Sequence, residues 1–506
     1  MIDQEKIVDD IMLDELEKKV PGCKEHINNT DSKKKRLGML SVLGSNYNRD
    51  YFEGYRSLIE KEKVCAEYIS DIVYTLRNYI GVADTQVKTH GEVMTPLWLV
   101  EKMLDTLPKH VWKNKHLKWL DPANGVGTFP SAIVKRLMEG LKEEIPDSCE
   151  RYQHIVENMI YVVEIQSKNM FLYHCAFDID NTHKLKTFYG SFLSKEFDEH
   201  MKNVWGIEKF DIVIGNPPFQ ESIIGNKRYK PLYNLFVDKI LPITKKSVLI
   251  IPSRWMYGGF GLDSFRDKMF NSRNIVSITH TNDASTYFGN SVDVVGGVSY
   301  YSIDINYNDL PTYNGVKGNL GDYDIFVEQN NKSLLNKVIS DNNLSNICKS
   351  QSYYGFPGNE GLFSRERKDD YIKVYVAKAK GLEMWVEKSL VSSDKLNGYK
   401  VFTPSANGNS PKFGNKILGK PNEVASKSYM TLLVNSESEG ISLISYMNTK
   451  FCNFFLSLRK TTQNMKPDTL KWIPMVPFDR EWTDSELYEY FKLTEDDIKL
   501  IEDRIR

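Results

Sequence analysis

Residues 211–219 read Asp-Ile-Val-Ile-Gly-Asn-Pro-Pro-Phe, a short apolar run followed by an asparagine, two prolines and an aromatic residue. The run from Phe210 to Ile214 predicts a buried strand that stops at Gly215. In open α/β sheets, ligands bind at the carboxyl ends of the strands. We therefore expect the four residues after this strand to be functional.

These four residues, Asn216, Pro217, Pro218 and Phe219, suit the activation of a planar amino group. The Asn216 side-chain oxygen and the Pro217 carbonyl can both accept hydrogen bonds from one NH2. The prolines fix φ and carry no competing donor, and the Phe219 ring can stack on a flat heterocycle. The alternative is a rigid turn after a strand, since Asn-Pro is a frequent turn dipeptide.

Residues 119–129, Trp-Leu-Asp-Pro-Ala-Asn-Gly-Val-Gly-Thr-Phe, predict a strand and a glycine turn, followed by a helix from Pro130 to Leu141. Gly125 and Gly127 allow the backbone to approach a ligand closely, and a side chain at Gly127 should occupy the space of that ligand. The turn lacks the third glycine of the dinucleotide fingerprint and the lysine of a P-loop. The alternative is a turn that only packs a helix onto a strand.

Residues 160–164, Ile-Tyr-Val-Val-Glu, predict another buried strand, which ends in an acidic residue. A carboxylate at this end suits both hydroxyls of a ribose. The alternative for Glu164 alone is a solvated strand end.

In this order, the segments resemble the S-adenosylmethionine-dependent N6-adenine DNA methyltransferases of the gamma motif order, which include the methylases of Eco57I-like restriction-modification systems. The resemblance covers residues 88–305 well and residues 330–480 loosely. Residues 216–219 look like the catalytic motif of the family and residues 121–129 like its cofactor loop. Further segments resemble the part closing over the methionine moiety, the helix after the catalytic motif, the following strand and a late hairpin: residues 91–96, 229–236, 247–253 and 289–298.

The resemblance implies a Rossmann-like α/β sheet with helices on both faces. It also implies metal-free methyl transfer from S-adenosyl-L-methionine to N6 of an adenine flipped out of double-stranded DNA. Phe219 and Phe288 would stack on the two faces of the target base. The cofactor would be bound by Thr95, Pro96, Asp121, Ala123, Asn124, Gly125, Gly127, Phe129, Glu164, Ile165, Ser191 and Phe192.

The sequence departs from the family pattern in two places. Ser191 stands where an aspartate usually holds the adenine amino group of the cofactor, and Asp178 and Asp180 are possible substitutes. Glu164 also lies further than the ~20 residues expected after a nucleotide-binding loop. We interpret residues 139–157, a charged helix and its connection, as a lengthened crossover.

Composition agrees with a large intracellular enzyme, and the resemblance implies the cytoplasm of a bacterial or phage-infected cell. The 506 residues should form two to four domains. Six scattered cysteines without a Cys-x-x-Cys pair fit a reducing compartment and argue against a zinc site or a disulfide framework. The chain does not begin like a signal peptide and has no apolar run near the ~20 residues of a membrane span.

Charge is distributed unevenly along the chain. The net charge is −1, but residues 331–480 hold 22 Lys and Arg against 13 Asp and Glu. Such an excess suits phosphate neutralisation in the part where the family keeps its target-recognition domain. The alternative is the solvated basic face of an ordinary domain.

We expect four regions. Residues 1–87 predict helices at Gln4–Lys19 and Tyr51–Tyr79, with a polar loop at 28–36 whose three lysines contact phosphate or solvent. Residues 88–320 predict the catalytic domain, with a late antiparallel strand at Val298–Ile303. Residues 330–480 predict a mixed α/β target-recognition domain, and residues 481–506 an acidic helix from Asp484 to Arg506.

Three segments of the third region are candidates for DNA contacts. Loops 351–358 and 403–412 are rich in glycine and hydrogen-bonding side chains, although many such loops are only connections. A helix predicted at Ile441–Leu458 leads into a basic, amide-rich segment, and a closing strand is predicted at Leu470–Pro474. The candidate residues are Arg459, Lys460, Gln463, Asn464 and Lys466.

Other functions remain open on the sequence. The main alternative is an RNA base N-methyltransferase with the same motif, although no RNA-binding module is evident. A protein glutamine methyltransferase and a DNA-binding protein with a decayed catalytic core are further alternatives. The residues before 88 are too few and too helical for a nuclease domain, so a restriction endonuclease would be a separately encoded partner. The sequence gives no oligomeric state and no recognition sequence.

Overall fold

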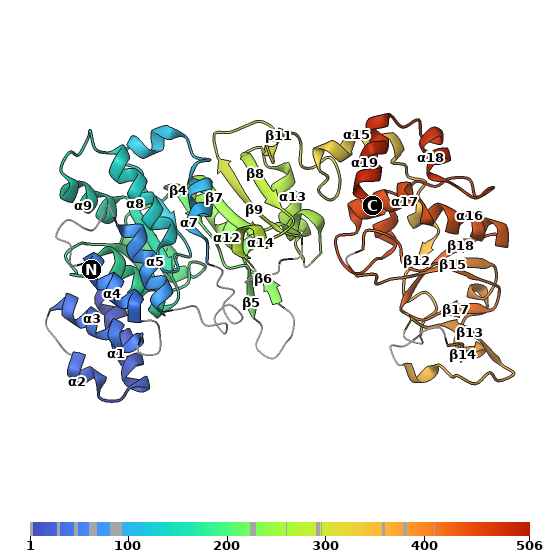
Figure 1. Cartoon of the computed structure of the whole chain (residues 1–506), viewed down its shortest axis with the longest axis horizontal. Coiled ribbons are helices and arrows are strands. Elements are labelled where there is room, and N and C mark those ends of the chain that lie inside the picture. The colour runs from blue at the N-terminus through green and yellow to red at the C-terminus, as the bar shows by residue number, and fades with distance from the viewer. Residues whose placement is uncertain are drawn as a thin grey trace. The chain divides into compact units, whose positions relative to one another are not determined.

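The computed structural model describes residues 4–27, 31–44, 49–59, 68–80, 94–222, 229–259, 261–289, 294, 296–356, 360–377, 382–408 and 410–505. The chain divides into two compact units, Met1–Gly321 and Asp322–Arg506 (Figure 1).

A large mixed sheet forms the centre of the first unit, in the strand order β11-β10-β8-β9-β7-β4-β1-β2-β3. Strands β3, β2, β1, β4 and β7 are parallel, and β9 runs antiparallel between β7 and β8. The strands are β1 (Trp119–Asp121), β2 (Ile160–Glu164), β3 (Lys186–Tyr189), β4 (Phe210–Gly215), β7 (Thr244–Pro252), β8 (Ile275–Thr281), β9 (Val298–Asp304), β10 (Thr312–Tyr313) and β11 (Val316–Lys317). The Rossmann-like α/β class and the late antiparallel strand are confirmed.

Strand β2 shows why its sequence is a continuous apolar run. Ile160 and Val162 pack into the core shared with helices α8 and α10. Tyr161 points the other way, with its ring 5.1 Å from Trp205 and 5.4 Å from Phe210. Successive side chains of a strand alternate between faces, so a strand covered on both faces is apolar at every position.

Helices connect the strands. They are α7 (Leu97–Leu104), α8 (Thr128–Gly140), α9 (Ser148–Asn158), α10 (Ser167–Phe177), α11 (Lys195–Asn203), α12 (Tyr233–Ile240), α13 (Asp263–Asn271) and α14 (Ser285–Phe288). Helix α8 lies where Pro130–Leu141 was predicted. The helix predicted at 229–236 begins later, because Tyr229–Pro231 forms β6, which pairs antiparallel with β5 (Gln220–Ser222).

The N-terminal helices belong to the same core as the sheet. They are α1 (Gln4–Lys19), α2 (Cys23–Ile27), α3 (Ser32–Leu43), α4 (Arg49–Ile59) and α5 (Ile69–Ile80). Val8, Leu40, Tyr55 and Leu76 from these helices are buried in one cluster with side chains of α8 and α10. Helix α1 is as predicted. The region predicted as one helix at 51–79 contains α4 and α5, and residues 60–67 lie outside the described residues.

The loop predicted at 28–36 is wrong from Ser32 onward, because α3 begins there after Asp31, whose side chain accepts from the Lys34 amide. Arg36 of this helix is fully buried, and its guanidinium lies 3.0 Å from both the Glu5 and the Asp9 carboxylates. Lys33 and Lys35 lie 3.6 Å and 3.1 Å from Asp180 and Asp10. The basic residues of this segment therefore join parts of the first unit together.

The second unit contains two small sheets and five α-helices within the described residues. The first sheet has the order β12-β18-β15-β16 and the second β14-β13-β17. The strands are β12 (Cys348–Lys349), β13 (Tyr371–Tyr375), β14 (Met384–Glu387), β15 (Tyr399–Pro404), β16 (Ile417–Gly419), β17 (Glu423–Ala425) and β18 (Tyr429–Val434). The helices are α15 (Gln329–Val338), α16 (Glu437–Asn448), α17 (Lys450–Arg459), α18 (Asp484–Tyr490) and α19 (Glu495–Arg504).

Three predicted elements of this unit are wrong in detail. The helix predicted at Ile441–Leu458 is interrupted by Thr449, which has extended ψ 152 and caps α17 through its hydroxyl. The closing strand predicted at 470–474 is replaced by a 3-10 turn at Pro467–Leu470 and one isolated bridge of Pro474 with Asn343. The C-terminal helix is divided into α18 and α19, because Thr494 starts a new capping box.

Two further observations concern the described residues as a whole. None of their helices is both long and apolar enough to cross a membrane. Cys23, Cys149, Cys175, Cys348 and Cys452 are free thiols.

Candidate active site

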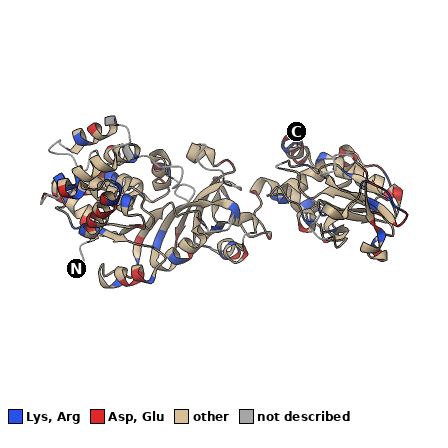
Figure 2. Cartoon of the chain, turned by 90° about the horizontal axis from the view of Figure 1, so that it is seen from below, with Lys and Arg blue, Asp and Glu red and all other residues tan. Residues whose placement is uncertain are grey.

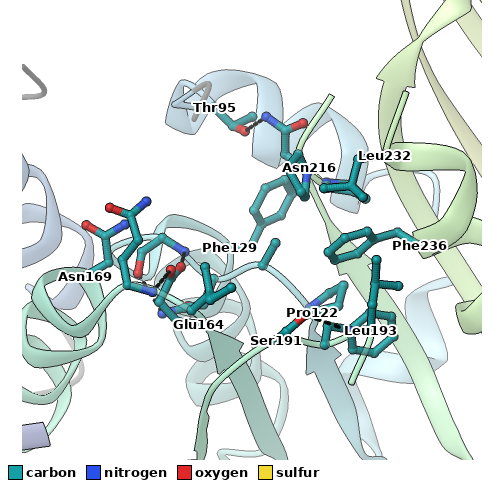
Figure 3. A pocket seen from close by; sticks show the side chains of 18 of the residues that line it. Thr95, Pro122, Phe129, Glu164, Asn169, Ser191, Leu193, Asn216, Leu232 and Phe236 are labelled. Carbon is teal, nitrogen blue, oxygen red and sulfur yellow. Dashed lines mark hydrogen bonds between the residues drawn. The ribbon is translucent and has the colours of Figure 1, made fainter. Parts of the chain in front are cut away.

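The carboxyl ends of four neighbouring parallel strands open into one cavity of about 350 Å³ (Figure 3). Residues after β1, β2, β3 and β4 line it, together with residues from the segment before α7 and from α8, β5, α10 and α12. This is the position at which a sheet of this topology binds ligands. The lining residues are Met94, Thr95, Pro122, Ala123, Asn124, Gly125, Val126, Thr128, Phe129, Glu164, Ile165, Gln166, Asn169, Gly190, Ser191, Phe192, Leu193, Asn216, Pro217, Pro218, Gln220, Glu221, Leu232 and Phe236.

Asn216, Pro217 and Pro218 lie at the end of β4 and line this cavity. The Asn216 Nδ2 donates a hydrogen bond to the Thr95 Oγ1 at 3.1 Å, as Figure 3 shows. This bond joins the segment before α7 to the end of β4. The side-chain nitrogen of Asn216 therefore already has a hydrogen-bond partner in the protein. The side-chain oxygen is on the opposite branch of the same amide.

Phe219 and Phe288 meet each other in this structure. Their ring centroids are 6.1 Å apart and their planes are inclined by 72°, which is an edge-to-face contact. Both rings are buried in the core of the first unit. The predicted pair is therefore adjacent, but a flat base has no room between the two rings in this arrangement. The hairpin residues 290–293 and 295, which follow Phe288, lie outside the described residues.

Glu164 lies beside the cofactor loop despite its distance in sequence. Its Oε2 accepts from the Gly125 amide at 2.7 Å, and its Oε1 accepts from the Gln166 amide at 2.7 Å. Strands β1 and β2 are adjacent and parallel, so α8, α9 and their connection form a long crossover between neighbouring strand ends. The carboxylate is thus fixed by two backbone donors at the edge of the cavity.

The two glycines of the loop have different surroundings. A Cβ at Gly125 would meet no atom of the described chain within 4 Å, whereas a Cβ at Gly127 would lie 2.8 Å from Phe177 and 3.0 Å from Tyr173. Both residues have positive φ, 57° and 98°. The expectation that a side chain at Gly127 would fill the ligand's space is therefore wrong, because its path leads into the protein core.

Asp121 lies beneath the loop. It is 2% exposed, and its Oδ1 accepts from the Ala123 amide at 3.1 Å. Burial raises the pKa of this carboxyl to about 7. The Asp121 carboxylate therefore stabilises the turn through the Ala123 amide. Ala123 lines the cavity, and Asp121 does not.

Ser191 lines the cavity just after β3, with Phe192 beside it. The two aspartates considered as substitutes are used elsewhere. The Asp178 carboxylate accepts from the backbone amides of Thr182 and His183 at 2.9 Å and 2.7 Å, and Asp180 pairs with Lys33. Neither aspartate is among the lining residues.

Most residues expected to bind the cofactor therefore surround the cavity. Pro96, Asp121 and Gly127 do not line it: Pro96 is the N-cap of α7, Asp121 is buried, and Gly127 faces Phe177 and Tyr173. The sequence reasoning missed Gln166 and Asn169 near the start of α10, Gln220 and Glu221 of β5, and Leu232 and Phe236 at α12. For Leu232 and Phe236 the signal was their spacing of four, which places both on one face of a helix.

The cavity fits S-adenosylmethionine in its chemistry. Glu164, a carboxylate able to accept from ribose hydroxyls, lies beside Gly125, where an added Cβ would meet open space. Within the described residues, the buried Oδ1 of Asn124 has no protein partner, as expected of a group that meets a ligand. Phe192, Leu193, Leu232 and Phe236 supply apolar walls suited to a flat heterocycle.

The candidate DNA contacts in the second unit separate into two groups. Arg459 is buried: its guanidinium donates to both oxygens of Asp324 at 2.7 and 2.8 Å and to Asp468 at 2.7 Å, and it lies 4.6 Å from the Trp472 ring. Lys460 donates to the carbonyls of Gly408 and Ser410, both at 2.8 Å. Both cations bind other parts of the protein. The burial of Arg459 contradicts the DNA contact expected of it, and the hydrogen bonds of Lys460 do not support one.

Gln463, Asn464 and Lys466 are exposed, and the structure pairs their segment with the loop predicted at 403–412. Asn407 donates its amide to the Gln463 carbonyl at 3.1 Å, and the Met465 amide donates to the Ser405 carbonyl at 2.6 Å. Ala406 and Asn464 form a β-bridge. Two loops separated by some fifty residues thus form one edge, which we call the paired-loop edge (residues 405–408 and 463–466). Residues 357–358 of the loop predicted at 351–358, and Asn409 of the 403–412 loop, lie outside the described residues.

Comparison with known proteins gives a consistent assignment. Residues 132–288 match the family "Eco57I restriction-modification methylase". An adenine-specific methylase of Mycoplasma pneumoniae, itself uncharacterised, is 26% identical over 289 residues, which cover 43% of this chain and 68% of that protein. The type II methyltransferase M.BstVI of Geobacillus stearothermophilus is 26% identical over 215 residues, 38% of this chain and 37% of that protein. The predicted resemblance is confirmed for residues 132–288, which match a family of restriction-modification methylases.

This chain also resembles several solved structures at low sequence identity. The type IIL restriction-modification enzyme MmeI in complex with DNA has 12% identity and a TM-score of 0.47, over 79% of this chain and 70% of that chain. A nuclease-deletion mutant of the type ISP enzyme LlaGI, in complex with a DNA substrate mimic, has 12% identity and a TM-score of 0.47, over 94% of this chain and 66% of that chain.

Proposed function

We propose that this chain, whose residues 132–288 form a restriction-modification methylase domain of the Eco57I type, transfers a methyl group from S-adenosyl-L-methionine to N6 of an adenine in double-stranded DNA. The observation that carries the proposal is the convergence of Asn216-Pro217-Pro218 and the Glu164–Gly125 pair on one cavity. The part of the cavity near Glu164 and Gly125 suits a nucleoside. The part near Asn216 and Pro217 suits an amino group.

Asn216 and Pro217 would hold the target amino group. The Asn216 Oδ1 and the Pro217 carbonyl accept from its two N–H groups, which turns the nitrogen lone pair out of conjugation with the ring and towards the methyl donor. When bound, S-adenosylmethionine supplies an activated methyl group. The residues contribute orientation and fixed dipoles, which are large sources of rate. The excess proton on N6 leaves to water, so a general-base carboxylate is not needed.

The target adenine would reach the cavity by leaving the base stack, at a cost of a few kcal/mol. Phe219 and Phe288 are the aromatic residues proposed to stack on the base, but they touch each other edge to face in this structure. Stacking on both faces of the base therefore requires the rings to separate when DNA binds. A base that rests on Phe219 alone requires a smaller rearrangement.

Duplex binding would use the paired-loop edge of the second unit, within the target-recognition domain proposed for residues 330–480. Lys and Arg are scattered among acidic residues over both units (Figure 2), so charge alone does not select one face. The edge is favoured because Gln463 and Asn464 are exposed on it, and amide side chains can pair with adenine in the major groove. Lys460 donates to the Gly408 carbonyl of this edge, and Arg459 binds Asp468, which follows it in the chain.

The decisive experiment incubates the protein with S-adenosylmethionine and mixed-sequence DNA, and maps modified adenines by single-molecule sequencing. We expect N6-methyladenine at one short sequence, with no product from an RNA of the same sequence. Asn216→Ala should lower kcat on the order of 10²–10³-fold, while cofactor and duplex affinities stay near those of the wild type. Near-normal methylation by Asn216→Ala would refute the mechanism. Methylation of RNA and not of DNA would show that the substrate is RNA.

A further inference from the structure

Thr95 links the N-terminal helices to the end of β4. Arg77 of α5 donates its Nη1 to the Thr95 carbonyl at 3.4 Å. The Thr95 hydroxyl oxygen in turn accepts from the Asn216 Nδ2 at 3.1 Å, across 121 positions in sequence. Thr95 is 4% exposed and lines the same cavity as Asn216. Its backbone and its side chain are thus each held by a different part of the first unit.

The two ends of an asparagine amide have nearly the same shape but opposite hydrogen-bonding character. An amino group on the substrate is a donor, so it is held only by Oδ1. With Nδ2 in that place, two donors would face each other. Nδ2 could also turn towards the Pro217 carbonyl and occupy the second acceptor. The orientation of this amide therefore decides whether the site offers two acceptors or none.

We propose that Thr95 is a positioning residue, which keeps the Asn216 amide turned with its oxygen towards the target amino group. The inference rests on the function proposed above. Thr95 acts by giving Nδ2 an acceptor away from the substrate. A hydroxyl can also donate to Oδ1, but that orientation would set the amide NH2 against the substrate NH2. Thr95 and the bound base together therefore select the productive orientation.

The position of the hydroxyl is itself fixed. Pro96 follows Thr95 and caps α7 with φ −63 and ψ 143, and Arg77 holds the carbonyl of Thr95. The Thr95 backbone therefore has little freedom to move its side chain away from Asn216. Through this contact, a helix of the N-terminal region contributes to the geometry of the catalytic asparagine.

The test compares the wild type with Thr95→Val and Thr95→Ser in the full chain. Valine keeps the shape and removes the hydroxyl, whereas serine keeps the hydroxyl. Single-turnover methyl transfer is measured at saturating cofactor and duplex, and the Kd for S-adenosylmethionine is measured by calorimetry. We expect Thr95→Val to transfer about tenfold or more slowly, as for loss of a buried donor's partner. Its cofactor Kd should stay within about threefold, and Thr95→Ser should recover most of the rate.

Each other outcome has a defined meaning. An unchanged rate in Thr95→Val overturns the inference and leaves the proposed function intact. If Thr95→Val transfers methyl slowly but its rate recovers at higher cofactor concentration, Thr95 is a cofactor contact. This result also overturns the inference. Thr95→Ala gives the same comparison if valine disturbs the fold. A wild-type protein that forms no N6-methyladenine overturns the proposed function, and the inference falls with it.

Discussion

Gly125 and Gly127 are two residues apart, yet the structure gives them different roles. Gly127 has φ 98°, and an added Cβ would press against Phe177 and Tyr173. Gly125 has φ 57°, which asparagine tolerates, and its Cβ would enter open space at the cavity wall. We therefore expect Gly127→Ala to lower the free energy of unfolding by about 1–3 kcal/mol. Gly125→Asn should keep the wild-type Tm and weaken cofactor binding about tenfold or more.

Thermal denaturation and calorimetry with S-adenosylmethionine separate the two effects. Each glycine variant serves as the control for the other, since both carry a small substitution in the same loop. A Gly127→Ala protein as stable as the wild type would contradict the packing argument. Undiminished cofactor affinity in Gly125→Asn would place the cofactor away from this loop.

Asp121 should make stability depend on pH. Burial raises the pKa of its carboxyl from about 4 to about 7. A group with a raised folded-state pKa favours the folded state in its protonated form, so stability is lost as the pH rises from about 4 through about 7. Asp121→Asn is neutral at every pH and keeps an oxygen for the Ala123 amide. Between pH 5 and pH 8 the wild type should lose roughly 2–3 kcal/mol more unfolding free energy than Asp121→Asn.

Urea denaturation at the two pH values measures this difference. Burial also raises the pKa of Glu5, to about 8, but Glu5 contributes equally to both proteins and cancels. An equal pH dependence in the two proteins would mean that the Asp121 carboxylate is already ionised in the folded protein at pH 5.

At the residue scale, sequence reasoning was reliable where a residue follows a parallel strand. Asn216, Glu164 and Ser191 could be placed together because the carboxyl ends of parallel strands meet at one edge. It was unreliable where burial decides the role. Arg459 is a residue type that often contacts DNA. Here Asp324 and Asp468, which lie outside its helix, form ion pairs with it and keep it buried in the protein. Nothing in the local sequence around Arg459 identifies those partners.

At the scale of elements, the paired-loop edge gives a prediction for DNA binding. Gln463→Ala or Asn464→Ala should weaken binding to the cognate duplex by about 1–3 kcal/mol and leave its salt dependence unchanged. Lys466→Ala should weaken binding to all sequences and reduce the salt slope by about 1. Fluorescence anisotropy over a range of salt concentrations, with cognate and scrambled duplexes, measures both effects.

Lys420→Ala is the matched control for the edge, because Lys420 is an exposed lysine of the same unit beside Glu437. It should change neither affinity nor slope. If the three edge variants behave like this control, the duplex is bound by another surface of the second unit.

Element boundaries in the second unit show a limit of periodicity. Residues 441–458 carry a helical pattern throughout, but Thr449 interrupts it, since its hydroxyl accepts from the Cys452 amide and starts a new helix. Threonine is favoured at helix N-caps, although helix interiors tolerate it at a small cost. The choice at Thr449 follows from tertiary packing, in which Phe451 and Tyr446 are both buried in the same core. The apolar strands of the first unit had no such ambiguity.

At the scale of the whole molecule, the described core side chains form separate clusters for the two units. The cluster of the N-terminal helices and the sheet contains residues from Val8 to Tyr300. The clusters of the second unit contain residues from Ile325 to Ile505. The N-terminal helices therefore depend on the sheet for burial, and deleting them would expose α8 and α10. The second unit has a core of its own, as an independently folding domain requires.

We therefore expect residues 322–506, expressed alone, to unfold cooperatively and to bind duplex DNA without binding S-adenosylmethionine. Residues 1–321 alone should bind the cofactor with an affinity within a few fold of the intact chain. Mixed at micromolar concentration, the two pieces should methylate DNA at least about a hundredfold more slowly than the intact chain, because a covalent link raises the effective concentration to about the millimolar range. Circular dichroism, calorimetry and the methylation assay test each part. If residues 322–506 show no cooperative unfolding transition, their core needs the first unit to fold. If the mixed pieces are as active as the intact chain, the two units associate tightly without the covalent link.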